Sequence, residues 1–120
     1  MTLDLSFELN FFESLIKRDP KNLRATEILA QLYTESGQIS NGLKMDRKLV
    51  RMAPDNPLAH YNLACSLSLK KRKKEAVETL EKAIDLGYSD FAWMNEDPDL
   101  IDLAHYQPFQ ELVQKHINKV

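Results

Sequence analysis

Two turn-forming segments lie 34 residues apart, and they constrain the fold more than any other feature of the chain. Pro20 and Pro54 occupy equivalent places in these segments, and Asn22 and Asn56 follow them at equal distance. The same 34-residue offset aligns several small or apolar residues in the sequence: Leu29 with Leu63, Ala30 with Ala64, Gly42 with Ala76, and Val50 with Ile84. A period of this length is typical of a repeated helix–turn–helix unit.

Residues 56–87 show this unit most clearly. Asn56 can accept a hydrogen bond from the first turn of a helix, and Pro57 fits the first helical position. Gly87 can take the left-handed conformation that ends a helix. Apolar residues recur at helical spacing on both sides of a basic segment: Leu63, Ala64 and Leu67, then Ala76, Val77, Leu80, Ala83 and Ile84. We predict two amphipathic helices that must bury their apolar faces against each other and against their neighbours.

The first half of the chain predicts three further helices. The first helix runs from about Asp4 to Arg18. The start of this segment alternates as a strand would, at Leu3, Leu5, Phe7 and Leu9. A helical stripe also runs along it, through Leu5, Leu9, Phe12 and Ile16, and we predict the helix. The second begins after Asn22 and closes at Gly37, and the third runs from about Ile39 to Met52.

The last thirty residues are expected to break the period. Asp97-Pro98 predicts the start of a short helix, and Gln107-Pro108 predicts the start of a longer one. We expect residues 91–120 to cap the end of the core, with Phe91 and Trp93 filling it.

Taken together, these residues resemble the tetratricopeptide repeat (TPR) consensus. Residues 23–56 supply Leu29, Ala30, Tyr33, Gly37, Gly42, Leu49 and Pro54, and residues 57–90 supply Leu63, Ala64, Leu67, Ala76, Leu80 and Ala83. The chain departs from the consensus at Thr26, Asp46, His60, Lys71 and Tyr88. The tail resembles those of small bacterial TPR proteins. The resemblance implies an all-α, short right-handed α-solenoid in one domain, divided into an N-terminal helix (4–22), two repeats (23–56 and 57–90) and a cap (91–120).

Composition narrows the classes of function. The formal net charge of −2 argues against a nucleic-acid protein driven by bulk charge. Cys65 is the single cysteine and cannot form an internal disulfide, which fits a reducing compartment. We find no signal peptide and no apolar stretch long enough for a membrane span, so a cytoplasmic protein is expected.

Catalytic and metal-binding patterns are absent from the sequence. The three histidines, His60, His105 and His116, are isolated, and a dyad of His60 with Asp102 has no support in the spacing. Cys65 has no second thiol with which to bind zinc. We therefore expect a non-catalytic protein without cofactor or metal, in which Cys65 is structural or lines a groove.

The TPR resemblance implies a protein or peptide partner in a concave groove. The groove residues that the resemblance implies in this chain are Arg24, Glu27, Gln31, Thr34, Leu58, Tyr61, Asn62, Cys65 and Ser68. Some members of the family hold a C-terminal carboxylate with Lys and Asn, but Glu27 and Gln31 stand at two of those places, and Glu27 would repel a carboxylate. Tyr61 and Leu58 are candidate anchors, although Tyr61 could instead be buried against the next helix.

Two alternatives remain open. The chain could be a self-associating module, because two and a half repeats are few for a stable solenoid and a homo-oligomer would complete the core. The run Lys70–Lys74 could contact an anion or nucleic acid. Because this run lacks interleaved aromatic residues and a supporting basic face, we interpret it as a solvated turn and regard nucleic acid as an unlikely partner.

Overall fold

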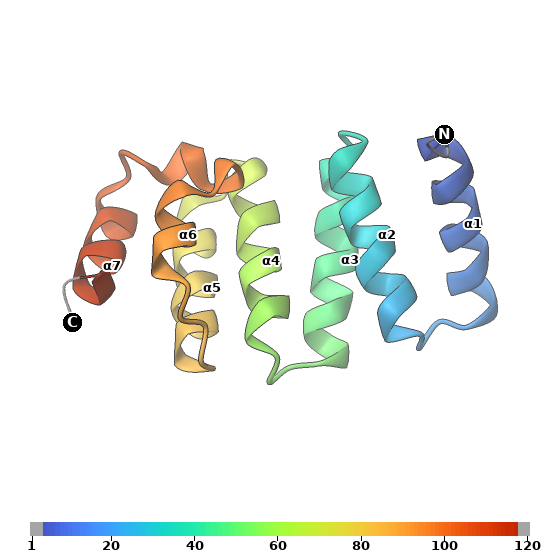
Figure 1. The fold of residues 1–120 in the computed structure, drawn as a ribbon, viewed down its shortest axis with the longest axis horizontal. Coiled ribbons are helices and arrows are strands. Elements are labelled where there is room, and N and C mark those ends of the chain that lie inside the picture. Colours follow the sequence, from blue (N-terminus) through green and yellow to red (C-terminus); the bar gives the residue numbers. More distant parts are fainter. Residues whose placement is uncertain (1–3, 118–120) are drawn as a thin grey trace.

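The computed structural model describes residues 4–117, and all regular elements in this range are helical (Figure 1). Leu3, part of the alternating pattern, and residues 118–120 of the expected cap lie outside the described residues. The elements are α1 (Leu5–Arg18), α2 (Leu23–Glu35), α3 (Ile39–Met52), α4 (Pro57–Leu69), α5 (Lys73–Asp85), α6 (Phe91–Glu96), the 3-10 helix η1 (Pro98–Leu103) and α7 (Gln107–Ile117). Within residues 4–117, no helix is both long and apolar enough to cross a membrane.

Helix starts follow the 34-residue period across three units. Helices α1, α3 and α5 begin at residues 5, 39 and 73, and α2, α4 and α6 begin at residues 23, 57 and 91. The side chains of Asn22, Asn56 and Asp90 each accept a hydrogen bond from a backbone N–H in the first turn of the helix that follows. The period therefore continues through α6 and ends at Asp97-Pro98, so the expectation that it breaks at residue 91 is wrong.

Three turns depend on left-handed backbone. Gly37 has a φ of 81° and Gly87 a φ of 116°, as expected for glycines that end helices. Lys71, which replaces Gly37 at an offset of 34, has a φ of 65°. The turn geometry is thus retained although a lysine occupies the position. The left-handed backbone is less favourable for this lysine than for glycine, because its Cβ lies too close to the backbone.

The helices stack into an elongated body of 45 × 27 × 26 Å, with α1 at one end and α7 at the other (Figure 1). Each of the first four helices packs against the next one in the chain. The C-terminal segment then turns back, so that η1 packs on α4 while α7 contacts α5 and α6. This reversal places η1 beside the first helix of the second repeat.

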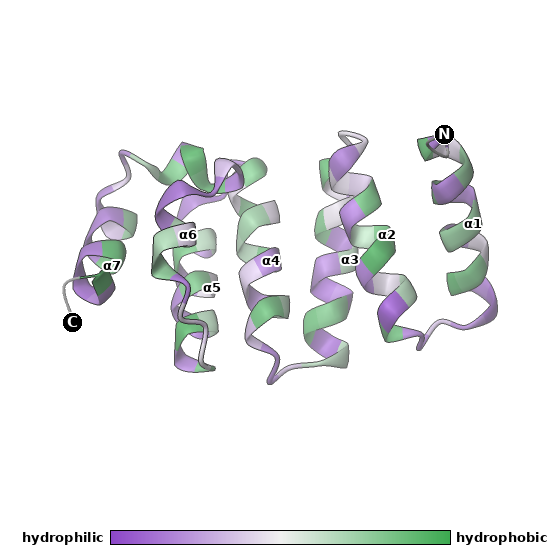
Figure 2. Cartoon of the chain, viewed as in Figure 1, coloured by the Kyte–Doolittle hydropathy of each residue, from purple (hydrophilic) through white to green (hydrophobic). Residues whose placement is uncertain are grey.

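The main core joins α4 and α5 to the C-terminal segment. Leu67, Leu80 and Leu103 are fully buried in it, and Ala64 and Ala76 are also inaccessible, as expected where two helices approach closely. Gly42 of α3 is the counterpart of Ala76, 34 residues earlier. A Cβ atom added to Gly42 would lie only 2.8 Å from Thr34 Oγ1 of α2, so α2 and α3 also approach closely. Figure 2 shows that the long helices carry both hydrophobic and hydrophilic residues, as this packing requires.

Candidate functional site

An open pocket of about 420 Å³ lies between α2, α4 and the α6–η1 segment. We call it the groove pocket. It is lined by Arg24, Glu27, Ile28, Ala30, Gln31, Thr34, Asp46, Leu49, Tyr61, Asn62, Cys65, Ser66, Leu69, Trp93, Asp97 and Asp99. The first helices of both repeats therefore share one hollow, and the C-terminal segment closes one side of it.

Seven of the nine residues expected in the groove line this pocket: Arg24, Glu27, Gln31, Thr34, Tyr61, Asn62 and Cys65. The other two lie elsewhere. Leu58 is 59% exposed and outside the lining, and Ser68 is fully buried. Helix α4 packs against three elements, α3, α5 and η1, whereas α2 packs mainly against α1 and α3. Ser68 is therefore enclosed, although Thr34, its counterpart in the first repeat, reaches the pocket.

Tyr61 is a structural residue rather than an exposed anchor. Its ring stacks on Tyr88, with centroids 4.3 Å apart and planes 5° apart. Its hydroxyl donates a hydrogen bond to Asp97 Oδ2 at 2.5 Å. Burial, and then the hydrogen bond to Asp97, raise the pKa of this phenol. Of the two interpretations of Tyr61, the structure supports burial.

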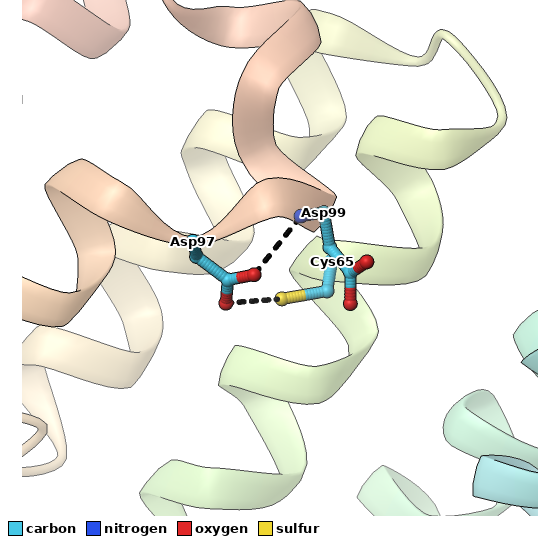
Figure 3. Close-up of side chains that lie close together, drawn as sticks. All are labelled: Cys65, Asp97 and Asp99. Carbon is cyan, nitrogen blue, oxygen red and sulfur yellow. Dashed lines mark hydrogen bonds between the residues drawn. The ribbon is translucent and has the colours of Figure 1, made fainter. Parts of the chain in front are cut away.

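Cys65, Asp97 and Asp99 come together in the wall of the pocket (Figure 3). The Cys65 thiol lies 3.6 Å from Asp97 Oδ2, and Asp97 Oδ1 accepts a hydrogen bond from the backbone N–H of Asp99 at 2.9 Å. Burial, and then the negative charges of Asp97 and Asp99, raise the pKa of the Cys65 thiol. The pKa of Asp99 is also raised, first by burial and then by Asp97.

This cluster is poorly suited to nucleophilic or metal chemistry. A nucleophilic cysteine needs a lowered pKa from nearby cations, and Cys65 has carboxylates beside it instead. A metal ion would need the thiolate and a free Asp97 oxygen, but Asp97 Oδ2 already accepts the Tyr61 hydroxyl. The arrangement instead holds η1 against α4 and presents carboxylate groups to the pocket.

Asp46 adds a buried acid to the same lining. It accepts a hydrogen bond from the Ser66 hydroxyl, which joins α3 to α4. Burial raises the pKa of this carboxyl to about 7, and the hydrogen bond from Ser66 acts in the opposite direction. Asp46 stands where the TPR consensus has an aromatic residue, so a polar bridge between helices replaces apolar contact.

Trp93 does not fill the end of the core, contrary to expectation. Its side chain is 46% exposed and lines the groove pocket. Met94, one residue later, is buried instead, because it occupies the fourth position of α6, which corresponds to the buried Thr26 and His60. Phe91 is partly buried and stacks on His116, with ring centroids 4.8 Å apart.

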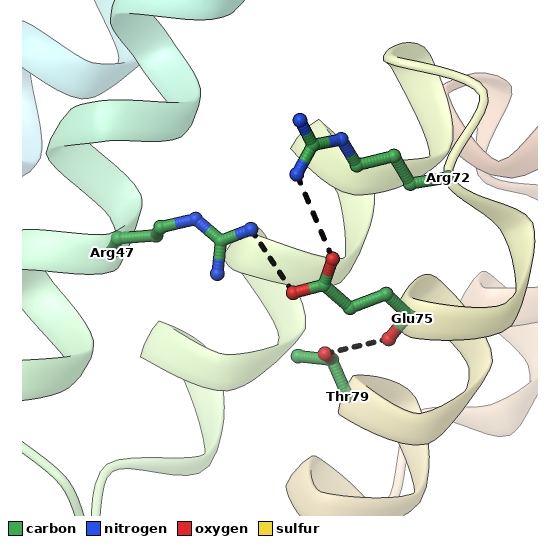
Figure 4. A network of polar contacts seen from close by, with 4 residues as sticks. All are labelled: Arg47, Arg72, Glu75 and Thr79. Atoms are coloured by element: carbon green, nitrogen blue, oxygen red, sulfur yellow. Dashed lines mark hydrogen bonds and ion pairs between the residues drawn. The ribbon is translucent and has the colours of Figure 1, made fainter.

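The other candidates from sequence have local structural roles. His60 Nε2 lies 2.8 Å from the Pro54 carbonyl oxygen, and Asp102 pairs with Lys71 at 2.6 Å, so the two do not form a dyad. The basic run is also engaged within the chain: Lys70 donates to Ser40, and Arg72 and Lys74 pair with Glu75 and Glu78. Figure 4 shows Glu75 held between Arg72 and Arg47.

Sequence reasoning missed the part of the site that η1 and α6 supply. The sequence indicated Asp97 only as part of a helix start, and it did not single out Asp99. Asp97 lies 36 residues from Tyr61 and 32 from Cys65. No local spacing signals such contacts, because they depend on the reversal of the chain after α6.

Comparisons with known proteins agree with this architecture. Residues 58–86 match the family model described as tetratricopeptide repeat. A TPR repeat-containing protein of Picosynechococcus sp. is 32% identical over 68 residues, covering 57% of this chain and 18% of that protein. The peroxisomal targeting signal receptor of Komagataella phaffii is 31% identical over 91 residues, covering 74% and 16% respectively.

The chain thus spans less than a fifth of the length of these curated relatives. A solved structure, the MamA RS-1 ArsTM double mutant, has the same fold with a TM-score of 0.69 and 17% identity, over 98% of this chain and 70% of that one. The repeated helix pairs, the 34-residue period and the matching family model together show that this chain is a tetratricopeptide repeat protein with a short helical solenoid.

Proposed function

We propose that this chain is a protein-interaction module that holds a peptide segment of a partner in the groove pocket. The observation that carries the proposal is the open hollow of about 420 Å³ at the positions where the TPR resemblance places partner contacts. This volume lies within the range of ligand pockets in proteins. Protein interaction is the general role of TPR repeats, and one relative is named as a receptor for a targeting signal.

The exposed lining favours an extended peptide with polar backbone contacts. Gln31 and Asn62 are exposed on the facing helices α2 and α4, and both can donate to and accept from a peptide backbone. Trp93 offers a large apolar surface at the C-terminal side of the pocket. A half-exposed aromatic residue in a hollow is the kind of residue that contributes strongly to binding.

Charge in the pocket favours a basic side chain on the peptide. No Lys or Arg within residues 4–117 pairs with Asp97 or Asp99. A lysine or arginine of the partner can pair with Asp99 and lie over the indole of Trp93. A free C-terminal carboxylate is disfavoured, because Glu27, Asp97 and Asp99 line the pocket and the cationic lining residue Arg24 pairs with Glu27 at 3.6 Å.

The test is a selection of peptides from a displayed random library on the immobilised chain, followed by affinity measurements on the enriched sequences by fluorescence polarisation. We expect enrichment of sequences with Lys or Arg next to an apolar residue. Trp93→Ala combined with Asp99→Asn should weaken binding by at least about tenfold. Tyr61 is unsuitable for this test because its removal would disturb the core.

Two controls separate the pocket from the rest of the surface. Leu58→Ala removes an equally exposed apolar side chain outside the pocket, and serine at Lys70–Lys74 removes the basic run; neither should change affinity. Enrichment of acidic sequences, or loss of binding only in the serine variant, would contradict the proposal. In that second case the basic turn would be the contact surface.

A further inference from the structure

Helix α1 carries a largely exposed apolar face formed by Phe7 and Phe11, whose aromatic contact within residues 4–117 is the edge-on packing of Phe11 against Phe12, with ring centroids 5.0 Å apart. None of its residues is buried, and Phe7 and Phe11 are 58% and 50% exposed. The two rings lie one helical turn apart, opposite the side of α1 that holds Leu9 and Ile16 towards the rest of the protein. Two adjacent exposed phenylalanines on a rigid helix indicate an interaction surface.

The repeat period relates this face of α1 to a contact between two second helices within the solenoid. Adding twice the 34-residue offset to Phe7 gives Glu75 on α5, and Glu75 reaches back to Arg47 on the preceding second helix, α3, at 3.0 Å (Figure 4). Glu75 thus points towards the preceding second helix of the solenoid, whereas Asn41, the equivalent residue of α3, is exposed and donates a hydrogen bond to Gln38. In α1 the same position holds a phenylalanine, which suits an apolar helix–helix contact.

The opposite end of the solenoid does not offer a matching surface. The exposed residues of α7 are mainly polar, Gln110, Glu111, Gln114 and Lys115 among them, although Ile117 at its C-terminal end is 39% exposed. Stacking of one copy's α1 on another copy's α7 would bury these polar groups against phenylalanine rings, which is unfavourable. The same face of α1 on a second copy of the chain offers an apolar surface that complements Phe7 and Phe11.

Charges on this face select one orientation. Asp4 lies at the N-terminal end of the face and Arg18 at its C-terminal end, and the uncharged Ser14 lies between Phe11 and Arg18. A parallel pair would bring Asp4 against Asp4 and Arg18 against Arg18, which is unfavourable for like charges. An antiparallel pair brings Asp4 of each copy opposite Arg18 of the other, and places the symmetry axis close to Phe11.

We propose that two copies of this chain associate through α1, antiparallel, with Phe7 and Phe11 at the centre of a two-fold interface. Such an interface uses the same surface on both copies and closes at the dimer, without forming fibres. A single helix face buries less area than a standard stable interface. The dimer therefore dissociates on dilution, and the groove pocket of each copy remains open.

Sedimentation velocity over a range of concentrations tests the association. The 120-residue chain should shift from monomer to dimer as concentration rises. Phe7→Ser with Phe11→Ser should be monomeric throughout, with unchanged helicity because both side chains are exposed. Leu58→Ser with Ile101→Ser removes two apolar residues elsewhere that are at least as exposed as Phe7 and Phe11, and this variant should dimerise as the parent does. A parent chain that stays monomeric up to ~1 mM would overturn the proposal.

Disulfide cross-linking tests the orientation. Phe11 lies at the expected axis and points into the interface, so Phe11→Cys should link two copies under mild oxidation. Lys17→Cys should not, because at a rise of about 1.5 Å per residue the two thiols would be about 18 Å apart. Cys65 is buried and does not compete. Linking of Lys17→Cys but not of Phe11→Cys would show a different packing and refute the antiparallel pair.

Discussion

Asp46→Asn should stabilise the protein above pH 7 and leave its stability almost unchanged near pH 4. Asp46 is buried between α3 and α4, and burial raises the pKa of its carboxyl to about 7 from an ordinary value of 3.8. Above pH 7 the folded protein must therefore hold a buried carboxylate, which is costly without a cation. Asparagine has nearly the same shape, stays neutral, and its amide oxygen can still accept the Ser66 hydroxyl.

The sign and size of the change in unfolding free energy follow from the pKa of the Asp46 carboxyl in the folded chain, about 7, and its ordinary value of 3.8 in the unfolded chain. Between pH 3.8 and about 7 the folded chain keeps a proton that the unfolded chain has released. The stabilising contribution of this proton is complete below 3.8 and is lost as pH rises towards 7. The difference corresponds to about 4 kcal/mol of unfolding free energy, at about 1.36 kcal/mol per pH unit. Asp46→Asn should recover most of it at about pH 8.

The assay is urea unfolding, followed by circular dichroism, of the parent and the variant at about pH 4, 6 and 8. Comparison at each pH cancels the titration of other groups. Ser66→Ala provides a control: it removes the hydrogen bond that opposes the raised pKa, so the loss of stability should move to higher pH. A difference between parent and Asp46→Asn that is the same at every pH would refute the reasoning, as would an Asn variant that is less stable than the parent at the highest pH.

Two further predictions concern the core and the tail. Ala64→Leu should lower the unfolding free energy by about 1–3 kcal/mol, because Ala64 is inaccessible where α4 meets α5; an unchanged thermal midpoint would mean that the helix register is wrong. Truncation after residue 90 should give a protein that aggregates or melts without cooperativity, because Leu67 and Leu80 pack in one core with Leu100, Leu103 and Phe109. A soluble 1–90 fragment with a two-state transition would show instead that the tail is an independent appendage.

Much of the helical framework could be predicted from local patterns. Helix α3 begins and ends at the residues expected, and α1 begins one residue after Asp4, whose side chain caps it. The helix over 91–96 was not predicted, although Asp90 stands at the capping position that Asn22 and Asn56 occupy in the two preceding units. The placement of Trp93 was wrong for a related reason: without the start of α6, its register could not be assigned.

The sequence by itself determined the helices, their turns and the repeat period, because caps, left-handed turns and apolar stripes act within a few residues of one another. The expected groove positions came from the TPR resemblance carried along this period, and seven of the nine line the groove pocket. Only the tertiary structure decided which groove residues are accessible. The chain reverses at Asp97-Pro98 and lays η1 on α4, which buries Tyr61 and Cys65 against Asp97 and leaves Trp93 in the pocket wall. These contacts depend on how a non-repeating segment packs on a repeating one, and periodicity carries no information about that packing.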